Sequence, residues 1–187
     1  TAPPDGDLVA VGCMSVDECL AVGGTGGATT AEEWDGASWT ALSGLPQMNE
    51  ATFTGVSCTT TACMAVGGYV TNGGVSRPEA YLWNGSSWKS TSPPGAGSTT
   101  PTSLNSVSCA WDGNCEADGS YSDQAAGDEG RSFVESWNGQ QWTVGVAPNP
   151  PGAESSQLEG VSCASAAWCI AVGGREYSNG TPLTYVS

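Results

Sequence analysis

Residues 55–88 contain the pattern that decides the fold of this chain. They read Gly55-Val-Ser-Cys58, a short turn, Cys63-Met-Ala-Val-Gly-Gly68, a looser loop, and Tyr81-Leu-Trp-Asn-Gly-Ser-Ser-Trp88. Successive side chains of a β-strand point to opposite faces, so Val56 and Cys58 would share one face of a strand. An Asn-Gly pair between two strand-like runs favours a tight hairpin turn, because the central residues of that turn need a positive φ. The stretch therefore predicts four short antiparallel strands, a to d.

The same order of signals returns along the whole chain, which makes it an internal repeat. Cysteines come in four close pairs, and the first cysteines are 45, 51 and 54 residues apart. A period near fifty residues is typical of a four-stranded propeller blade. The cysteine pairs are Cys13/Cys19, Cys58/Cys63, Cys109/Cys115 and Cys163/Cys169, and the tryptophan pairs that enclose Asx-Gly are Trp34/Trp39, Trp83/Trp88 and Trp137/Trp142.

These signals predict an all-β protein, a β-propeller of four-stranded antiparallel blades. We expect one propeller region over residues 1–187, with repeats at about 1–50, 51–100, 101–152 and 153–187. The fourth repeat has the signals of strands a, b and c only, which gives three full repeats and an incomplete one. A bare end of a blade stack exposes apolar faces and unpaired edges. We therefore expect the region to belong to a larger ring, completed by further blades or by other chains.

The cysteine pairs predict four local disulfides. In each repeat the turn after strand a returns the chain antiparallel, so the second cysteine can lie opposite the first at a distance that a disulfide spans. A zinc site is the competing interpretation, but the chain has no His and the pairs lie a full blade apart. Eight cysteines in bridges favour an oxidising compartment, so we expect a secreted, extracellular protein. We expect no membrane insertion, because the sequence has no apolar run long enough to span a bilayer.

The charge balance excludes one class of partner. The chain has 4 Lys+Arg against 19 Asp+Glu, a formal net charge of −15. Phosphate backbones would be repelled, so no nucleic-acid partner is expected, and anionic lipid surfaces are disfavoured on the same grounds. The acidity otherwise fits the solubility of a secreted protein.

The repeat resembles known propeller families. The double glycine after an apolar strand, followed by a Trp in the last strand, resembles the kelch repeat, and the Asx-Gly-x-x-Trp turn resembles the Asp-box of sialidase-type propellers with one residue fewer between Asx and Gly. The stapled hairpin belongs to neither pattern. The chain as a whole is most similar to the Cys-paired, Trp-Asn-Gly-containing repeats of secreted actinobacterial (bacterial) proteins. The resemblance covers essentially the whole chain and implies the fold, while propellers host unrelated activities.

The sequence offers little for catalysis, and we expect a protein that is not an enzyme. The chain lacks His, the commonest general base, and its cysteines are expected in bridges. A pair of carboxylates, as in glycosidases, would be the alternative. Sialidases clamp a carboxylate with three arginines, and this chain has Arg77, Arg131 and Arg175 in or beside the b–c loops. They do not occupy equivalent positions in the repeat, so we expect no such clamp.

The third repeat carries an acidic group that could bind a cation. Asp118 replaces the apolar residue that the other repeats have as valine, and Asp123, Asp128 and Glu129 follow. Clustered hard oxygen ligands can hold Ca²⁺, although the spacing is not that of an EF-hand. The alternative, which we favour, is a solvated acidic loop with Asp118 turned outward. Ca²⁺ is the one cofactor worth testing here, and otherwise none is expected.

Two tryptophans fall outside the repeat pattern. Trp111 and Trp168 lie within the stapled a–b turns, where packing between blades does not demand them. Exposed aromatic rings on rigid turns suit stacking on sugar rings or docking of a protein, whereas the alternative is that they cover the disulfides. We expect a non-catalytic, lectin-like binding or adhesion module for a cell-surface glycan or protein. The alternatives are a glycan-active, sialidase-like hydrolase and a structural subunit completed by a neighbouring chain.

Overall fold

The computed structural model describes residues 7–25, 27–45, 49–97, 100–110, 113–123, 127, 129–145, 147, 151–177 and 183–186. Within these ranges the chain forms fifteen β-strands and no helix. The strands make four antiparallel sheets in chain order, three of four strands and a last one of three. The predicted all-β repeat architecture is therefore confirmed.

Each sheet is formed by one repeat, and its strands are ordered as they occur in the chain. The first sheet holds β1 (Leu8–Ser15), β2 (Glu18–Thr25), β3 (Ala28–Trp34) and β4 (Trp39–Ala41). The second holds β5 (Thr52–Cys58), β6 (Cys63–Val70), β7 (Ser76–Trp83) and β8 (Trp88–Ser90). The third holds β9 (Thr102–Cys109), β10 (Cys115–Asp123), β11 (Glu129–Trp137) and β12 (Trp142–Gly145), and the fourth holds β13 (Ser155–Ser165), β14 (Trp168–Glu176) and β15 (Leu183–Val186).

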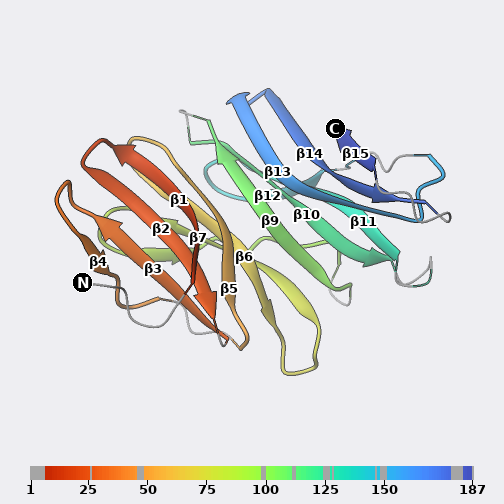
Figure 1. Ribbon diagram of the computed structural model, residues 1–187, viewed down its shortest axis with the longest axis horizontal. Helices are drawn as coiled ribbons and strands as arrows, with labels where there is room; N and C mark the ends of the chain where they lie inside the picture. The colour runs from red at the N-terminus through yellow and green to blue at the C-terminus, as the bar shows by residue number, and fades with distance from the viewer. Residues whose placement is uncertain are drawn as a thin grey trace.

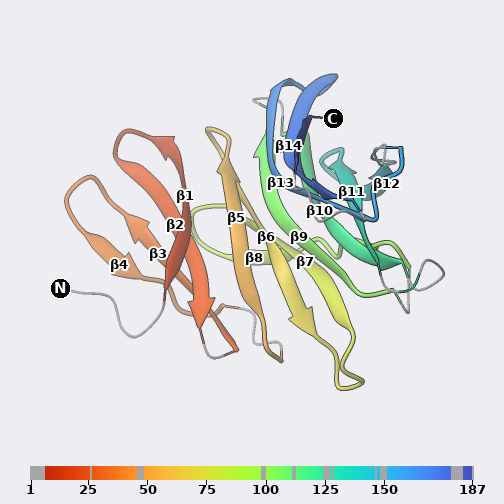
Figure 2. The ribbon, with the colours of Figure 1, turned by 45° about the vertical axis from the view of Figure 1, so that its right-hand side comes forward.

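The four sheets stack face to face and spread like a fan (Figures 1 and 2). The first strand of each sheet contacts the first strand of the next, so β1, β5, β9 and β13 lie in a row. This is the arrangement of consecutive β-propeller blades, whose first strands line the axis. The a–b turns and c–d turns lie at one end of the strands, the stapled face. The b–c loops and the connections between sheets lie at the other end, the opposite face.

The first glycine of the double-glycine motif is required by a bulge in the first strand of each sheet. Gly67 pairs with Phe53, next to a register shift in β5. A Cβ on Gly67 would lie 2.0 Å from the backbone oxygen of Thr52, far inside contact distance. The same close approach, 1.9–2.0 Å, occurs at the equivalent glycines Gly23, Gly119 and Gly173. Only glycine fits where the bulged backbone comes this near.

The disulfides and the Asx-Gly turns close the stapled face. In every sheet the two cysteines are directly opposed in register, with Cα atoms 3.9–4.0 Å apart, and the four predicted bonds are present. At the c–d turn the side-chain oxygen of Asn84 accepts the backbone N–H groups of Ser86 and Ser87, and Gly85 has φ of 85°. The flanking Trp83 and Trp88 pack with ring centroids 5.0 Å apart.

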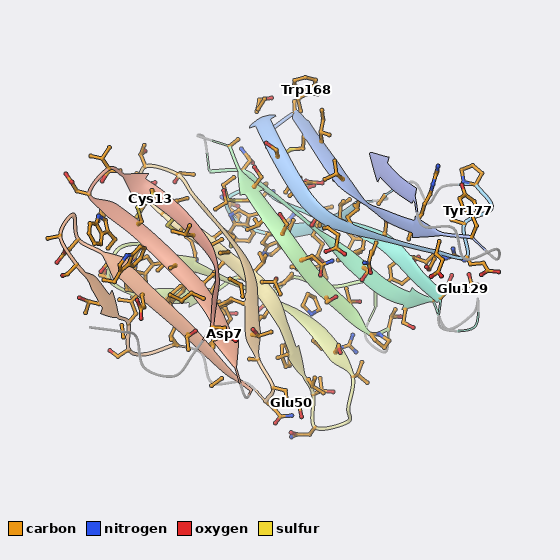
Figure 3. The ribbon with its side chains drawn as sticks, in the orientation of Figure 1. Asp7, Cys13, Glu50, Glu129, Trp168 and Tyr177 are labelled. Carbon is orange, nitrogen blue, oxygen red and sulfur yellow. A yellow bond between two sulfur atoms is a disulfide. The ribbon has the colours of Figure 1, made fainter. Side chains whose placement is uncertain are left out.

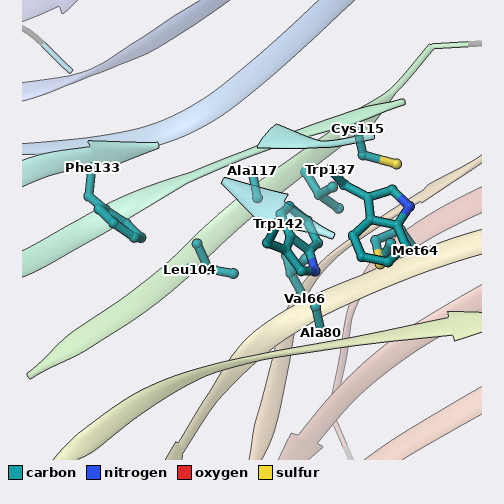
Figure 4. Close-up of a cluster of buried hydrophobic side chains, with 10 residues drawn as sticks. Met64, Val66, Ala80, Leu104, Cys115, Ala117, Phe133, Trp137 and Trp142 are labelled. Carbon is teal, nitrogen blue, oxygen red and sulfur yellow. The ribbon is translucent and has the colours of Figure 1, made fainter. Parts of the chain in front are cut away.

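The core lies between the sheets. Figure 4 shows the cluster between the second and third sheets, in which Met64 and Val66 of β6 pack against Leu104, Phe133 and the Trp137/Trp142 pair. All of these side chains are buried. Burial of apolar area stabilises a fold by about 25 cal/mol per Å². The interface between sheets is therefore the stabilising unit of the molecule.

Candidate functional site

A small cavity opens on the stapled face between the third and fourth sheets. It has a volume of about 120 Å³ and lies between Cys115 and the Cys163–Cys169 disulfide. Its polar lining residues are Asn114, Glu116, Ser136, Asn138, Ser165 and Thr143. We call it the stapled-face cleft. Uncharged hydrogen-bonding groups beside one carboxylate, with two sulfur bridges as walls, suit a small polar ligand or one substituent of a larger one.

Two substitutions in β10 make this interface different from the others. At the second interface Met64 and Val66 of β6 face the next sheet and are buried in the apolar cluster. The registers place Glu116 and Asp118 at the equivalent positions of β10. Carboxylates have replaced apolar side chains on the face that meets the fourth sheet, and one of them lines the cleft.

Glu116 is held at the wall of the cleft. Its carboxylate accepts a hydrogen bond from the hydroxyl of Ser136, directly across the pair of strands β10 and β11. Burial raises the pKa of Glu116, and the bond from Ser136 opposes this shift. A carboxylate fixed in this position can accept hydrogen bonds from a ligand rich in hydroxyl groups.

Trp168 lies on the turn that the Cys163–Cys169 bridge closes. Strand alternation places it on the side of β14 that carries Ile170 and Val172, whereas the neighbouring Cys169 lines the cleft. Two residues of the same turn, Ser165 and Ala166, line the cleft. Trp168 is 65% exposed and projects from the stapled face (Figure 3). It does not cover the disulfide as a core side chain would. Trp111, the other predicted aromatic, lies outside the described residues.

Asp118 is the buried member of the two carboxyls. Its side chain is fully inaccessible to water, so the expectation that it turns outward is wrong. Burial raises its pKa to about 7, with a further contribution from the charge of Glu159, while the backbone N–H of Ser106 opposes the shift. No hydrogen bond of regular geometry reaches either carboxylate oxygen from the described residues. A buried acid without a good partner favours the neutral form.

The predicted calcium ligands are not gathered at one point in the part of the chain that the structure describes. Asp123 and Glu129 both form ion pairs with Arg131, which places a cationic side chain between the two carboxylates. Asp118 lies five residues earlier on β10, at the interface with the fourth sheet. Asp128 is outside the described residues. Those that are described include no group of three acidic or cysteine side chains able to hold a metal, and the calcium site stays a prediction.

The arginines divide into two classes, and the expectation that none are equivalent is wrong. Arg77 and Arg131 both lie six residues before the first Trp of their c–d turns. Arg77 donates to the backbone oxygens of Gly97 and Thr100, 2.6 and 3.1 Å away. Arg131 donates in the same way to the backbone oxygens of residues 153 and 154, which lie in the connection between the third and fourth sheets, at 3.2 and 3.3 Å. Sequence reasoning missed this because it compared the arginines with the b–c loops and not with the tryptophans.

Arg175 is placed differently, beside a larger cleft on the opposite face. This cleft has a volume of about 340 Å³ and is lined by Ser155, Ser156, Gln157 and Arg175, with Gly130 across from them. The guanidinium lies 5.3 Å from the ring centre of Tyr177, within cation–π distance. Its Nε atom is buried and has no hydrogen-bond partner among the described residues. Gly130 also lines a cleft of about 240 Å³ at the preceding interface, so the two hollows adjoin.

Two more buried carboxyls went unrecognised in the sequence. Burial raises the pKa of Glu79 to about 8 and that of Glu135 to about 7. Glu135 accepts the backbone N–H of Gly95 at 2.8 Å, which opposes the effect of burial. Both lie on third strands, where acids alternate with apolar residues and the buried face cannot be identified before the sheet packing is known.

Comparison with known proteins identifies no family for this chain. No family model and no curated protein matches this chain. Among solved structures, one described as "YCF48 bound to D1 peptide" is similar over 97% of this chain and 68% of that chain, with 14% sequence identity and a TM-score of 0.48. The assignment of propeller blades made above rests on the strand registers and sheet packing of this chain.

Proposed function

We propose that this protein is an extracellular binding module that recognises a glycan at the stapled-face cleft. The observation that carries the proposal is the exposed Trp168 on a turn that a disulfide holds rigid, since the same turn also supplies Ser165 and Ala166 to a polar hollow. An indole face offers a large apolar contact to a sugar ring, and nearby carboxylate, amide and hydroxyl groups can pair with its hydroxyls. The four local disulfides support an extracellular setting. The part of the chain that the structure describes offers no helix of the length and apolarity that a membrane span requires.

The size of the cleft suggests how such a ligand is held. A volume of about 120 Å³ admits one substituent of a sugar, not a whole oligosaccharide. The substituent would enter between Glu116 and Asn138, and an adjoining part of the glycan would reach over the turn to Trp168. A rigid site of this kind loses little side-chain freedom on binding, which favours affinity despite a small contact area.

A glycan array followed by calorimetry on the strongest hit tests the proposal. Trp168→Ala should weaken binding by roughly five- to thirtyfold, since an aromatic stacking contact contributes roughly 1–2 kcal/mol. Val16→Ala is the matched control, because Val16 is an 89% exposed side chain on the equivalent turn of the first sheet. An array with no glycan hit, together with a protein captured in a pull-down that Trp168→Ala abolishes, would replace the glycan by a protein ligand. Binding unaffected by Trp168→Ala would remove the site.

A glycan-active hydrolase is the second candidate, and Glu116 is the observation in its favour. A carboxyl with a raised pKa in a cleft is the property of a general acid. Glycosidases need a second carboxylate nearby, and Glu116 is the only acid among the described residues that line the cleft. Two of the three arginines hold backbone oxygens, which disfavours a sialidase-type clamp. Turnover of a fluorogenic glycoside panel that Glu116→Gln abolishes would establish the hydrolase; no turnover would leave the binding module.

A further inference from the structure

The three buried interfaces between sheets repeat one arrangement of side chains. The first strand of each later sheet presents a large apolar residue and, three positions on, a valine to the second strand of the sheet before it. In β5, β9 and β13 these pairs are Phe53/Val56, Leu104/Val107 and Leu158/Val161. The large residue of each pair is fully buried. At the first two interfaces the side chains that receive them are Leu20/Val22 of β2 and Met64/Val66 of β6.

Polar groups on the first strands fix the register between neighbouring sheets. The Thr54 hydroxyl donates to the backbone oxygen of Leu104 at 2.7 Å, and the Asn105 amide donates to that of Leu158 at 2.6 Å. Farther along, the Ser57 hydroxyl accepts the backbone N–H of Cys109 at 2.9 Å. At the next interface, the Ser108 hydroxyl accepts the backbone N–H of Cys163 at 3.0 Å. The second and third sheets thus present a hydroxyl at the same place for the first strand of the next sheet.

The two outermost faces of the stack carry the unpaired halves of this same arrangement. On the first sheet, Leu8 and Val11 occupy the positions of Phe53 and Val56 but are 36% and 60% exposed. We call this pair and its surroundings the leading face. On the last sheet, Ile170 and Val172 occupy the positions of Met64 and Val66 but are 44% and 43% exposed; this is the trailing face. The internal equivalents of Leu8 and Val11 are buried or partly buried, and those of Ile170 and Val172 in β2 and β6 are buried. Large apolar side chains that are exposed only at the two ends of the stack mark an interaction surface.

We propose that the leading face of one molecule packs on the trailing face of a second copy of this chain, and so continues the stack of sheets. In that contact Leu8 and Val11 meet Ile170 and Val172, as Phe53 and Val56 meet the β2 side chains inside the molecule. Ser162, which is equivalent to Ser57 and Ser108, accepts the backbone N–H of Cys13 of the second copy. This contact would continue the three interfaces that the chain already forms between its own sheets.

The contact joins two different surfaces, so it is heterologous. Such a contact closes into a ring when the rotations add up to a full turn and otherwise continues as an open assembly. Two copies bring eight sheets together, a number found in closed propellers, which have about 4–8 blades. In a closed ring of two copies, each copy uses both its leading face and its trailing face, and neither face stays exposed. The trailing face differs from the internal interfaces at Glu159. This residue occupies the position of Thr54 and Asn105, whose side chains donate hydrogen bonds to the next sheet.

Sedimentation velocity on the full chain over roughly a hundredfold range of concentration tests the proposal. The wild type should sediment as a dimer or larger species, and Val11→Asp and Val172→Asp should each raise the dissociation constant at least a hundredfold, because each buries a charge in an apolar contact. Val16→Asp places the same charge at an exposed turn outside both faces and is the control. Circular dichroism and thermal unfolding of each variant confirm that it folds.

Mixing the two variants distinguishes this contact from any symmetric one. Val11→Asp keeps an intact trailing face and Val172→Asp keeps an intact leading face, so an equimolar mixture should form a dimer that neither forms alone. A wild type that stays monomeric at every concentration overturns the proposal. So does a mixture that stays monomeric, or a loss of association with Val16→Asp as large as that with the face variants. Trp168 lies on the same side of β14 as Ile170 and Val172, so glycan binding is measured on Val11→Asp, which leaves Trp168 and the trailing face unchanged. Its success or failure then does not depend on the association of two copies.

Discussion

The buried carboxyl of Asp118 should make the stability of this protein depend on pH, and replacing it should remove that dependence. The change is Asp118→Val, which restores the residue that β2, β6 and β14 have at the equivalent position. Valine fits an inter-sheet position that is apolar elsewhere and loses no regular hydrogen bond. We expect the variant to be more stable than the wild type at neutral and alkaline pH.

The direction follows from proton binding by the two states. In the unfolded chain Asp118 takes up its proton only near its ordinary pKa of 3.8, whereas burial raises its folded pKa to about 7. Between these values the folded state binds more protons, so its stability falls as the pH rises. The contribution is fully present below pH 4 and is lost by about pH 8. Glu116 and Glu159 are the other acids that bear on this carboxyl.

The magnitude is large enough to measure. A pKa difference of about 3 units corresponds to about 4 kcal/mol, and relaxation and water entry around the ionised group reduce this to roughly 2–4 kcal/mol. The difference in unfolding free energy between Asp118→Val and the wild type should therefore grow by that amount from pH 4 to pH 8.

Urea denaturation followed by tryptophan fluorescence at pH 4, 6 and 8 gives this difference directly. Glu18→Gln, which neutralises an exposed acid, controls for the general repulsion in a chain of net charge −15. A difference between Asp118→Val and the wild type that does not change with pH would refute the reasoning. A variant less stable than the wild type at pH 8 would refute it as well.

Three further variants test other parts of the structure. Gly67→Ala forces a Cβ against the bulged strand and should destabilise by roughly 2 kcal/mol or more, whereas the neighbouring Gly68→Ala should cost clearly less, as chemical denaturation would show. Arg77→Gln loses the hydrogen bonds to the connection between the second and third sheets and should destabilise by roughly 2 kcal/mol; an unchanged melting temperature would contradict this role of Arg77. Glu135→Gln should raise the unfolding free energy at pH 8 and leave it nearly unchanged at pH 4, since burial raises the pKa of this acid to about 7.

Much of the fold could be predicted from the sequence because its signals are local. A cysteine pair across a short turn, or Asn84-Gly85 between two strands, determines its own hairpin. The sequence did not indicate why position 67 must be glycine, because the bulge that Gly67 faces belongs to another strand, β5. The site was harder to predict, since burial depends on which face meets the next sheet. Asp118 was expected to turn outward, but the strand alternation that buries the equivalent Val66 also buries Asp118.

A peptide map of the native, non-reduced protein by mass spectrometry tests most directly whether each repeat is a self-contained, stapled sheet. We predict four disulfides and no free thiol, joining Cys13 to Cys19, Cys58 to Cys63, Cys109 to Cys115 and Cys163 to Cys169. A bond between cysteines of two different repeats would contradict the account.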